Sequence, residues 1–198
     1  MSTVRSTLDR LVSYAGLLAA VILLVAGGLL TWASSFIGDQ VNTQLSEQHI
    51  TMPTSQAYGS LPQADQDALA PYAGKAMTTG PMAKAYADHY ILVHMNEAAD
   101  STYKALNMTS PGSAYADVPD RAVCGQDATS TACTSLQSLK ATLFQGSTLR
   151  GLLLYGYAFA TIGTIASYAA IGAYIGGVLM LILGILGFVH ARRVEAQA

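Results

Sequence analysis

The histidines and carboxylates in the middle of the chain are the residues that could hold a metal ion. His94 and Glu97 stand three residues apart, so they would share one face of a helix, and Asp88 and His89 closely precede them. His89 and His94, however, would be turned apart by more than about 100° around a helix. The chain also lacks the His-Glu-x-x-His pattern of zinc proteases. The sequence therefore favours histidines on an ordinary helix surface and predicts no metal ligands.

The motifs of other enzyme classes are missing too. The chain has no Gly-x-Ser-x-Gly elbow, no Ser-x-x-Lys pair in a context that fits a nucleophile, and no glycine loop that would cradle a phosphate. No basic patch with interleaved aromatic residues supports nucleic-acid binding. We therefore expect a protein that is not an enzyme, with no catalytic residues, no cofactor and no evident small-molecule substrate.

Cys124 and Cys133 are the two cysteines of the chain, and a short polar loop, GQDATSTA, separates them. In an oxidising compartment such a pair forms a disulfide by default. The alternative is a redox or metal-binding pair. A metal site needs about four ligands, usually with closer cysteines, and no histidine lies near these two in the sequence. The sequence therefore predicts a structural disulfide.

Two long uncharged segments dominate the rest of the chain, and only 11% of all residues are charged. Residues 151–191 hold no Asp, Glu, Lys or Arg, and residues 11–37 are free of charge as well. A membrane helix needs about 20 apolar residues, so residues 151–191 have about twice the length of one span. Residues 11–37 are longer than the roughly 7–15 apolar residues of a signal peptide. Trp32 and Phe36 lie at the far end of this segment, as in an interfacial aromatic belt.

Basic residues near the ends of these segments indicate the topology. Arg5, Arg10, Arg192 and Arg193 would all lie in the cytoplasm if both termini do, whereas a model with three spans would place the last two outside. Residues 39–147 carry ten acids against five bases. We therefore expect a plasma-membrane protein with both termini in the cytoplasm. Its predicted parts are a cytoplasmic tail (1–10), transmembrane helix 1 (11–37), an extracytoplasmic domain (38–147), an aromatic helix in the outer leaflet or packed on protein (148–164), transmembrane helix 2 (165–190) and a cytoplasmic tail (191–198).

The helical spacing of apolar residues continues beyond both predicted spans. The first helix is predicted from about residue 8 to about residue 50, with Pro53 forcing its end. Further helices are predicted from Pro81 to about Leu106 and from about Thr134 into the second apolar segment. The expected fold is mainly α: an integral membrane protein whose two transmembrane helices extend into a small helical, disulfide-containing extracytoplasmic domain.

The excess length of the second apolar segment predicts a surface for a partner. Tyr155, Tyr157 and Phe159 lie in this excess, where they would contact either lipid at the membrane interface or another protein.

A ridge of small residues follows in the predicted span. Gly172 and Gly176 form a Gly-x-x-x-Gly pattern, and Gly163 and Ala169 extend it. Small residues allow close helix packing, so the ridge predicts a helix neighbour. The first helix, a second copy and a foreign subunit all remain open as that neighbour.

Three stretches carry a resemblance to a known family: WASSFIGDQVNTQLSEQHITMP, AKAYADHYILVHMNEAADSTYKAL and GSTLRGLLLYGYAFATIGTIASYAAIGAYIGG. Together they resemble a family of small actinobacterial membrane proteins with two spans and an extracytoplasmic domain. Some of its members are described as hypothetical and some as aromatic ring-opening dioxygenases. The dioxygenase description implies an iron site, and because no matching ligand set is present in this sequence, we reject it for this chain.

The sequence therefore favours a non-enzymatic accessory subunit that docks on a larger bacterial membrane complex and contacts membrane lipid. By analogy of size and topology, the complex could be respiratory, such as the cytochrome bcc–oxidase supercomplex. One alternative is an extracytoplasmic sensor or ligand-binding module. The other is a metal-dependent enzyme that would use His94 and Glu97.

Overall fold

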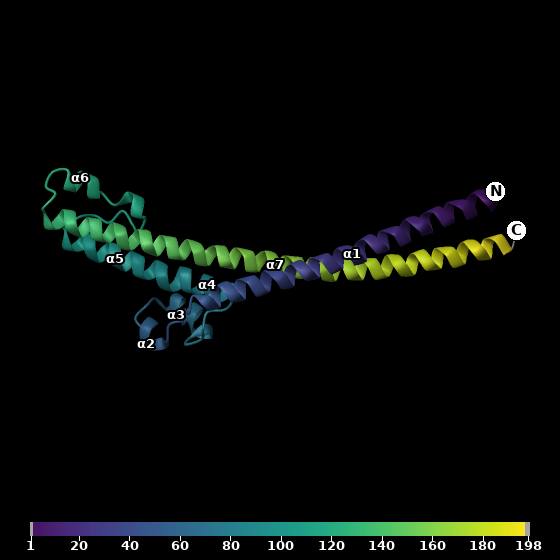
Figure 1. The fold of residues 1–198 in the computed structure, drawn as a ribbon, viewed down its shortest axis with the longest axis horizontal. Helices are drawn as coiled ribbons and strands as arrows, with labels where there is room; N and C mark the ends of the chain where they lie inside the picture. Colours follow the sequence, from purple (N-terminus) through teal and green to yellow (C-terminus); the bar gives the residue numbers. More distant parts are fainter. Residues whose placement is uncertain (1, 197–198) are drawn as a thin grey trace. The chain divides into compact units, whose positions relative to one another are not determined.

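The structure, a computed structural model, describes residues 2–196, and these are mainly helical (Figure 1). The two long helices, α1 (Ser2–Glu47) and α7 (Thr131–Ala196), are each long and apolar enough to cross a membrane. The short elements between them are α2 (Ser55–Tyr58), α3 (Gln63–Leu69), η1 (Ala70–Tyr72), α4 (Gly80–Tyr86), η2 (Ala87–Ile91), α5 (Leu92–Ala105), η3 (Tyr115–Asp117) and α6 (Asp120–Cys124). The chain divides into a two-helix unit, formed by residues up to Asp39 and from Thr161 onward, and a small domain, Gln40–Ala160.

In the two-helix unit, small residues recur every seven positions where α1 and α7 face each other. On α1 they are Ser13, Ala20, Gly27 and Ser34; on α7 they are Gly163, Ala170, Gly177, Gly184 and Ala191. A Cβ atom added to Gly177 would lie 2.9 Å from Leu24, and one added to Gly184 would lie 2.9 Å from Leu17. The backbones therefore approach more closely than larger side chains would allow. We call this contact the small-residue seam.

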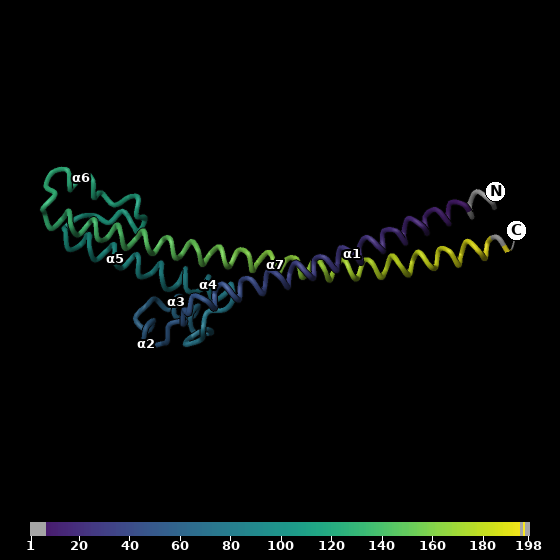
Figure 2. The backbone as a smooth tube through the Cα atoms, viewed as in Figure 1, coloured from purple at the N-terminus to yellow at the C-terminus, as the bar shows by residue number. Residues whose placement is uncertain are grey.

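The seam sets an antiparallel register, and the two helices lie side by side through this unit (Figure 2). Ile37 contacts Gly163 at one end, and Ser13 contacts Gly187 at the other. The Ser34 hydroxyl donates a 2.8 Å hydrogen bond to the carbonyl of Gly163. A polar side chain between apolar helices is thus satisfied by backbone across the seam, which supports the register.

Aromatic residues mark both ends of the paired apolar length. Tyr14 packs edge-on against Phe188, with ring centroids 4.8 Å apart. Trp32 and Tyr168 are exposed at the other end, and the register places them at about the same level. At ~1.5 Å per residue, about 27 Å separates Tyr14 from Trp32 and about 30 Å separates Tyr168 from Phe188. Both lengths match the hydrocarbon core of a bilayer, about 30 Å.

The small domain begins with the last turns of α1, which ends at Glu47 because His49 takes a left-handed conformation with φ of 51°. The chain then turns back on itself through a single antiparallel bridge between Thr51 and Ala76. Apolar side chains from this turn and from the short helices form a buried core: Met52, Tyr58, Leu61, Leu69, Met77 and Met82.

The helices α4, η2 and α5 follow one another without a gap and lie along the first part of α7 (Figure 1). Gly80 allows the close approach at one point, because an added Cβ would collide with Ala160; Gly146 does the same against Met95. Three leucines on this part of α7 are buried, namely Leu136, Leu139 and Leu143. The predicted helix from Pro81 to about Leu106 is confirmed, although η2 is a π-helical turn within it.

One difference from the sequence prediction concerns residues 148–164 and 165–190, which were expected as separate helices. α7 runs through both without a break. No proline interrupts the segment, and Gly163 packs against Ile37 instead of ending a helix. Residues 151–191 therefore extend about 60 Å in one helix, about twice the hydrocarbon thickness. The apolar length that exceeds the hydrocarbon thickness lies on the N-terminal side of Tyr168.

Candidate functional site

The part of α7 within the small domain presents one uncovered, mostly apolar face. Phe144, Leu152, Tyr155 and Phe159 are all more than half exposed, and Ala141 continues their spacing. At 100° per residue, these five side chains fall within an arc of roughly 80°. We call them the outer face of α7. A soluble helix would present polar residues at such positions, so this surface is suited to contact with an apolar partner.

Tyr157 was predicted to share a surface with Tyr155 and Phe159, but the structure places it on the other side of α7. Its ring lies beneath the ammonium group of Lys84, which is 5.6 Å from the ring centroid. A cation over a tyrosine ring is attracted by the negative face of the ring. Tyr157 therefore takes part in the packing of α4 on α7, whereas Tyr155 and Phe159 point outward.

A cluster of three charges lies between η2 and α7, on the same side as Tyr157. Asp88 accepts hydrogen bonds from the Lys84 ammonium group and from the Arg150 guanidinium group, the latter at 2.8 Å. Burial alone would raise the pKa of Asp88, but the hydrogen bonds and positive charges of Lys84 and Arg150 lower it below its usual value. The ion pair between Arg150 and Asp88 joins α7 to η2.

We expect Asp88→Asn to destabilise the small domain by about 1 kcal/mol at pH 7, since the carboxylate interacts with two cations but Lys84 is 44% exposed and partly screened. A carboxyl group with a lowered pKa stabilises the fold above its unfolded pKa, about 3.9, and this stabilisation is lost as the pH falls through the folded pKa. The difference between the two proteins should therefore shrink once the pH falls below about 3.9. Thermal unfolding of the full chain in mild detergent at pH 7 and about pH 3 measures it. The exposed Asp100→Asn should change little at either pH.

The cysteine pair forms the predicted disulfide, Cys124–Cys133, between the end of α6 and the start of α7. The Asp120–Lys140 ion pair, with N and O 2.6 Å apart, also attaches α6 to α7. Hydrogen bonding to Lys140 is the main cause that lowers the pKa of Asp120. The disulfide and the ion pair together hold α6 against α7, beside the outer face of α7 near Phe144.

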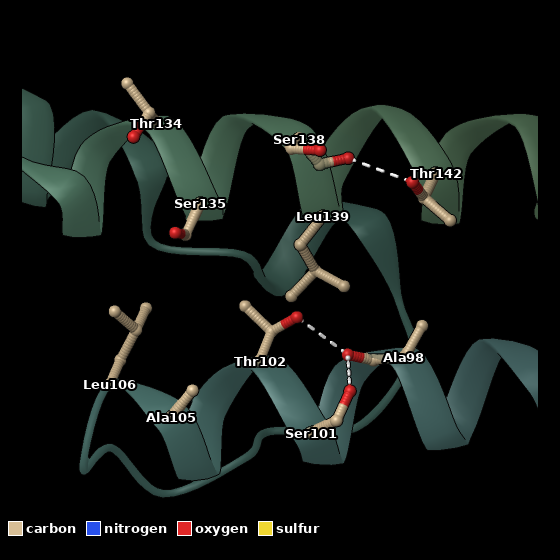
Figure 3. A pocket seen from close by; sticks show the side chains of 10 residues that line it. All are labelled: Ala98, Ser101, Thr102, Ala105, Leu106, Thr134, Ser135, Ser138, Leu139 and Thr142. Carbon is tan, nitrogen blue, oxygen red and sulfur yellow. Dashed lines mark hydrogen bonds between the residues drawn. The ribbon is translucent and has the colours of Figure 1, made fainter.

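A second surface feature is an open groove of about 520 Å³ between α5 and α7 (Figure 3). Its lining includes hydroxyl groups from both helices: Ser101, Thr102, Thr134, Ser135, Ser138 and Thr142. Ser101 and Thr102 both donate to the carbonyl of Ala98, and Thr142 donates to that of Ser138. No charged residue lines the groove, so its chemistry points to no particular ligand class.

The glycines predicted to pack against another helix occupy different environments. A Cβ atom added to Gly176 would lie 3.4 Å from Leu23 of α1, which is ordinary van der Waals contact. One added to Gly172 would meet nothing within 4 Å. The small-residue seam with α1 is therefore formed by the seven-residue series that contains Gly177. The space beside Gly172 is free for another helix.

The histidines considered as metal ligands each have local partners. His89 Nδ1 lies 2.8 Å from a carboxylate oxygen of Asp65 in α3, and His94 Nδ1 lies 2.7 Å from the carbonyl oxygen of Tyr90. Among the side chains that the structure describes, no three of the His, Cys, Asp and Glu types gather closely enough to hold a metal ion.

Comparison of this chain with known protein families, curated proteins and solved structures finds no match.

Proposed function

We propose that this protein is a non-enzymatic accessory subunit that docks on a larger membrane complex through the outer face of α7. In this proposal α1 and α7 cross the plasma membrane between their aromatic ends, with both termini in the cytoplasm. The basic residues Arg10, Arg192 and Arg193 support this orientation.

The observation that carries the proposal is the position of the outer face along α7. Tyr155 precedes the aromatic level of Tyr168 by 13 residues, about 20 Å along a helix. The polar headgroup layer adds only about 5–8 Å on each side of the hydrocarbon core. Lipid at the aromatic level would therefore not reach most of the outer face, which leaves protein as the apolar contact.

The test uses the full chain, purified in mild detergent from the membranes of its organism of origin. We expect the wild-type chain to co-purify with a stoichiometric membrane complex, and Leu152→Arg with Phe159→Arg to reduce the recovered complex about tenfold or more, because two buried apolar contacts would become charged. The matched control is Asn96→Arg, since Asn96 is exposed on α5 rather than on the outer face. A wild-type chain that migrates alone would count against docking.

A respiratory complex such as the cytochrome bcc–oxidase supercomplex is the specific candidate that size and topology suggest. The reduced-minus-oxidised absorbance spectrum of the co-purified complex tests it, because a respiratory assembly of this kind contains haem. A stoichiometric complex without haem would exclude this candidate and leave docking intact.

A further inference from the structure

The outer face of α7 ends in a pocket at the side of the small domain that carries the disulfide. The pocket has a volume of about 320 Å³ and is lined by Tyr115, Asp120, Gln137, Lys140, Ala141 and Phe144. Tyr115 comes from η3 and meets Phe144 edge to face, with ring centroids 5.2 Å apart. Because Ala141 and Phe144 belong to the outer face, the pocket and the face form one continuous surface.

We propose, building on the proposed function, that a helix of a membrane-spanning partner lies along the outer face of α7 and places one apolar or aromatic side chain in this pocket. The volume suits such an anchor, since a cavity of about 150 Å³ already holds a benzene ring. The edge of Phe144 and the ring of Tyr115 offer the aromatic contacts that interface anchors favour.

The distribution of charge on α7 and at the pocket indicates which class of partner fits this surface. Arg150 is the one charged residue of α7 between residues 141 and 191, and it is turned to the opposite side, toward Asp88. The ion pair at the pocket, Asp120–Lys140, is already internally neutral. The occupant therefore needs no countercharge and must be apolar along the same length of helix. A helix that leaves the membrane beside α7 meets this requirement, whereas the polar surface of a soluble protein does not.

Photo-crosslinking in native membranes tests the proposal. The full chain would carry p-benzoylphenylalanine in place of Phe144, Tyr155 or Phe159, with Asn96 on α5 as the control position. We expect all three positions on the outer face to label the same partner within one apolar helix. The adducts of positions 144 and 159 should lie about 15 residues apart in the partner sequence, as two helices side by side require.

The outcomes separate this inference from the proposed function. Partner adducts from positions 155 and 159, together with lipid or no adduct from position 144, would overturn the pocket and leave docking standing. No protein adduct at any of the three positions would overturn both. As a second measurement, Tyr115→Ala combined with Phe144→Ala should reduce the recovered complex about tenfold, whereas Tyr115→Phe should preserve it. Equal recovery with the alanine variant would also count against the anchor.

Discussion

Replacing Gly177 and Gly184 together by leucine is expected to force α1 away from α7 and to lower the melting temperature of the purified protein by about 5–15 °C. At each position a Cβ atom alone would lie 2.9 Å from a leucine of α1, and the neighbouring α1 backbone is close as well: the carbonyl oxygen of Ala20 would be 3.4 Å from the Cβ of residue 177. Overpacking of this kind costs about 1–3 kcal/mol per site. Circular dichroism of the chain in mild detergent measures the change.

The matched control is Gly172→Leu on the same helix. Its added side chain would enter open space, since no atom lies within 4 Å of the Cβ position. Both variants replace glycine in a helix by a better helix former, so helix propensity favours both of them, and the double variant about twice as much as the control. If Gly172→Leu lowered the melting temperature as far as the double variant does, the small-residue seam would not be what holds the two helices together. Purification without partners is essential, because Gly172 could also meet a foreign helix.

The seam also shows what the sequence could and could not predict about helix packing. Gly172 and Gly176 stand out because Gly-x-x-x-Gly is a local pattern on one helix. The series of Gly163, Gly177 and Gly184 also stands in the sequence, but only the observed antiparallel register shows that this series, and not Gly172, faces α1. That register depends on contacts such as Ser34 with Gly163, which join residues 129 positions apart in the chain. Local patterns do not determine such long-range pairing.

The candidate site was predictable to a similar degree. The disulfide, the helical content and the two long apolar helices all followed from spacing and composition. The face of α7 that remains uncovered did not, because it is set by how α4, η2 and α5 dock. Gly80, Gly146 and the Asp88–Arg150 ion pair decide that docking, and each of them contacts a residue more than fifty positions away. Tyr157 was consequently grouped with Tyr155, although the two point to different sides.

The leucines of α7 provide the clearest separation of folding from docking. Leu143→Ala should destabilise the small domain by about 2–5 kcal/mol, because Leu143 is fully buried (0% exposed) and its removal leaves a cavity. Leu152→Ala should change the stability by no more than about 0.5 kcal/mol, because Leu152 is 60% exposed. Both substitutions remove the same atoms from the same helix, so a difference between them reports burial alone.

Hydrogen–deuterium exchange of the full chain in mild detergent measures this difference where it arises. In Leu143→Ala, the backbone amides of α5 should exchange about 30-fold faster or more, since the small domain would open more often. In Leu152→Ala they should exchange at the wild-type rate, while recovery of the proposed membrane complex falls. Unchanged exchange in Leu143→Ala would contradict the assignment of α5 and α7 to one core. A complex recovered in full from Leu152→Ala, or lost equally from the exposed α5 variant Asn96→Ala, would instead contradict the outer face as the docking surface.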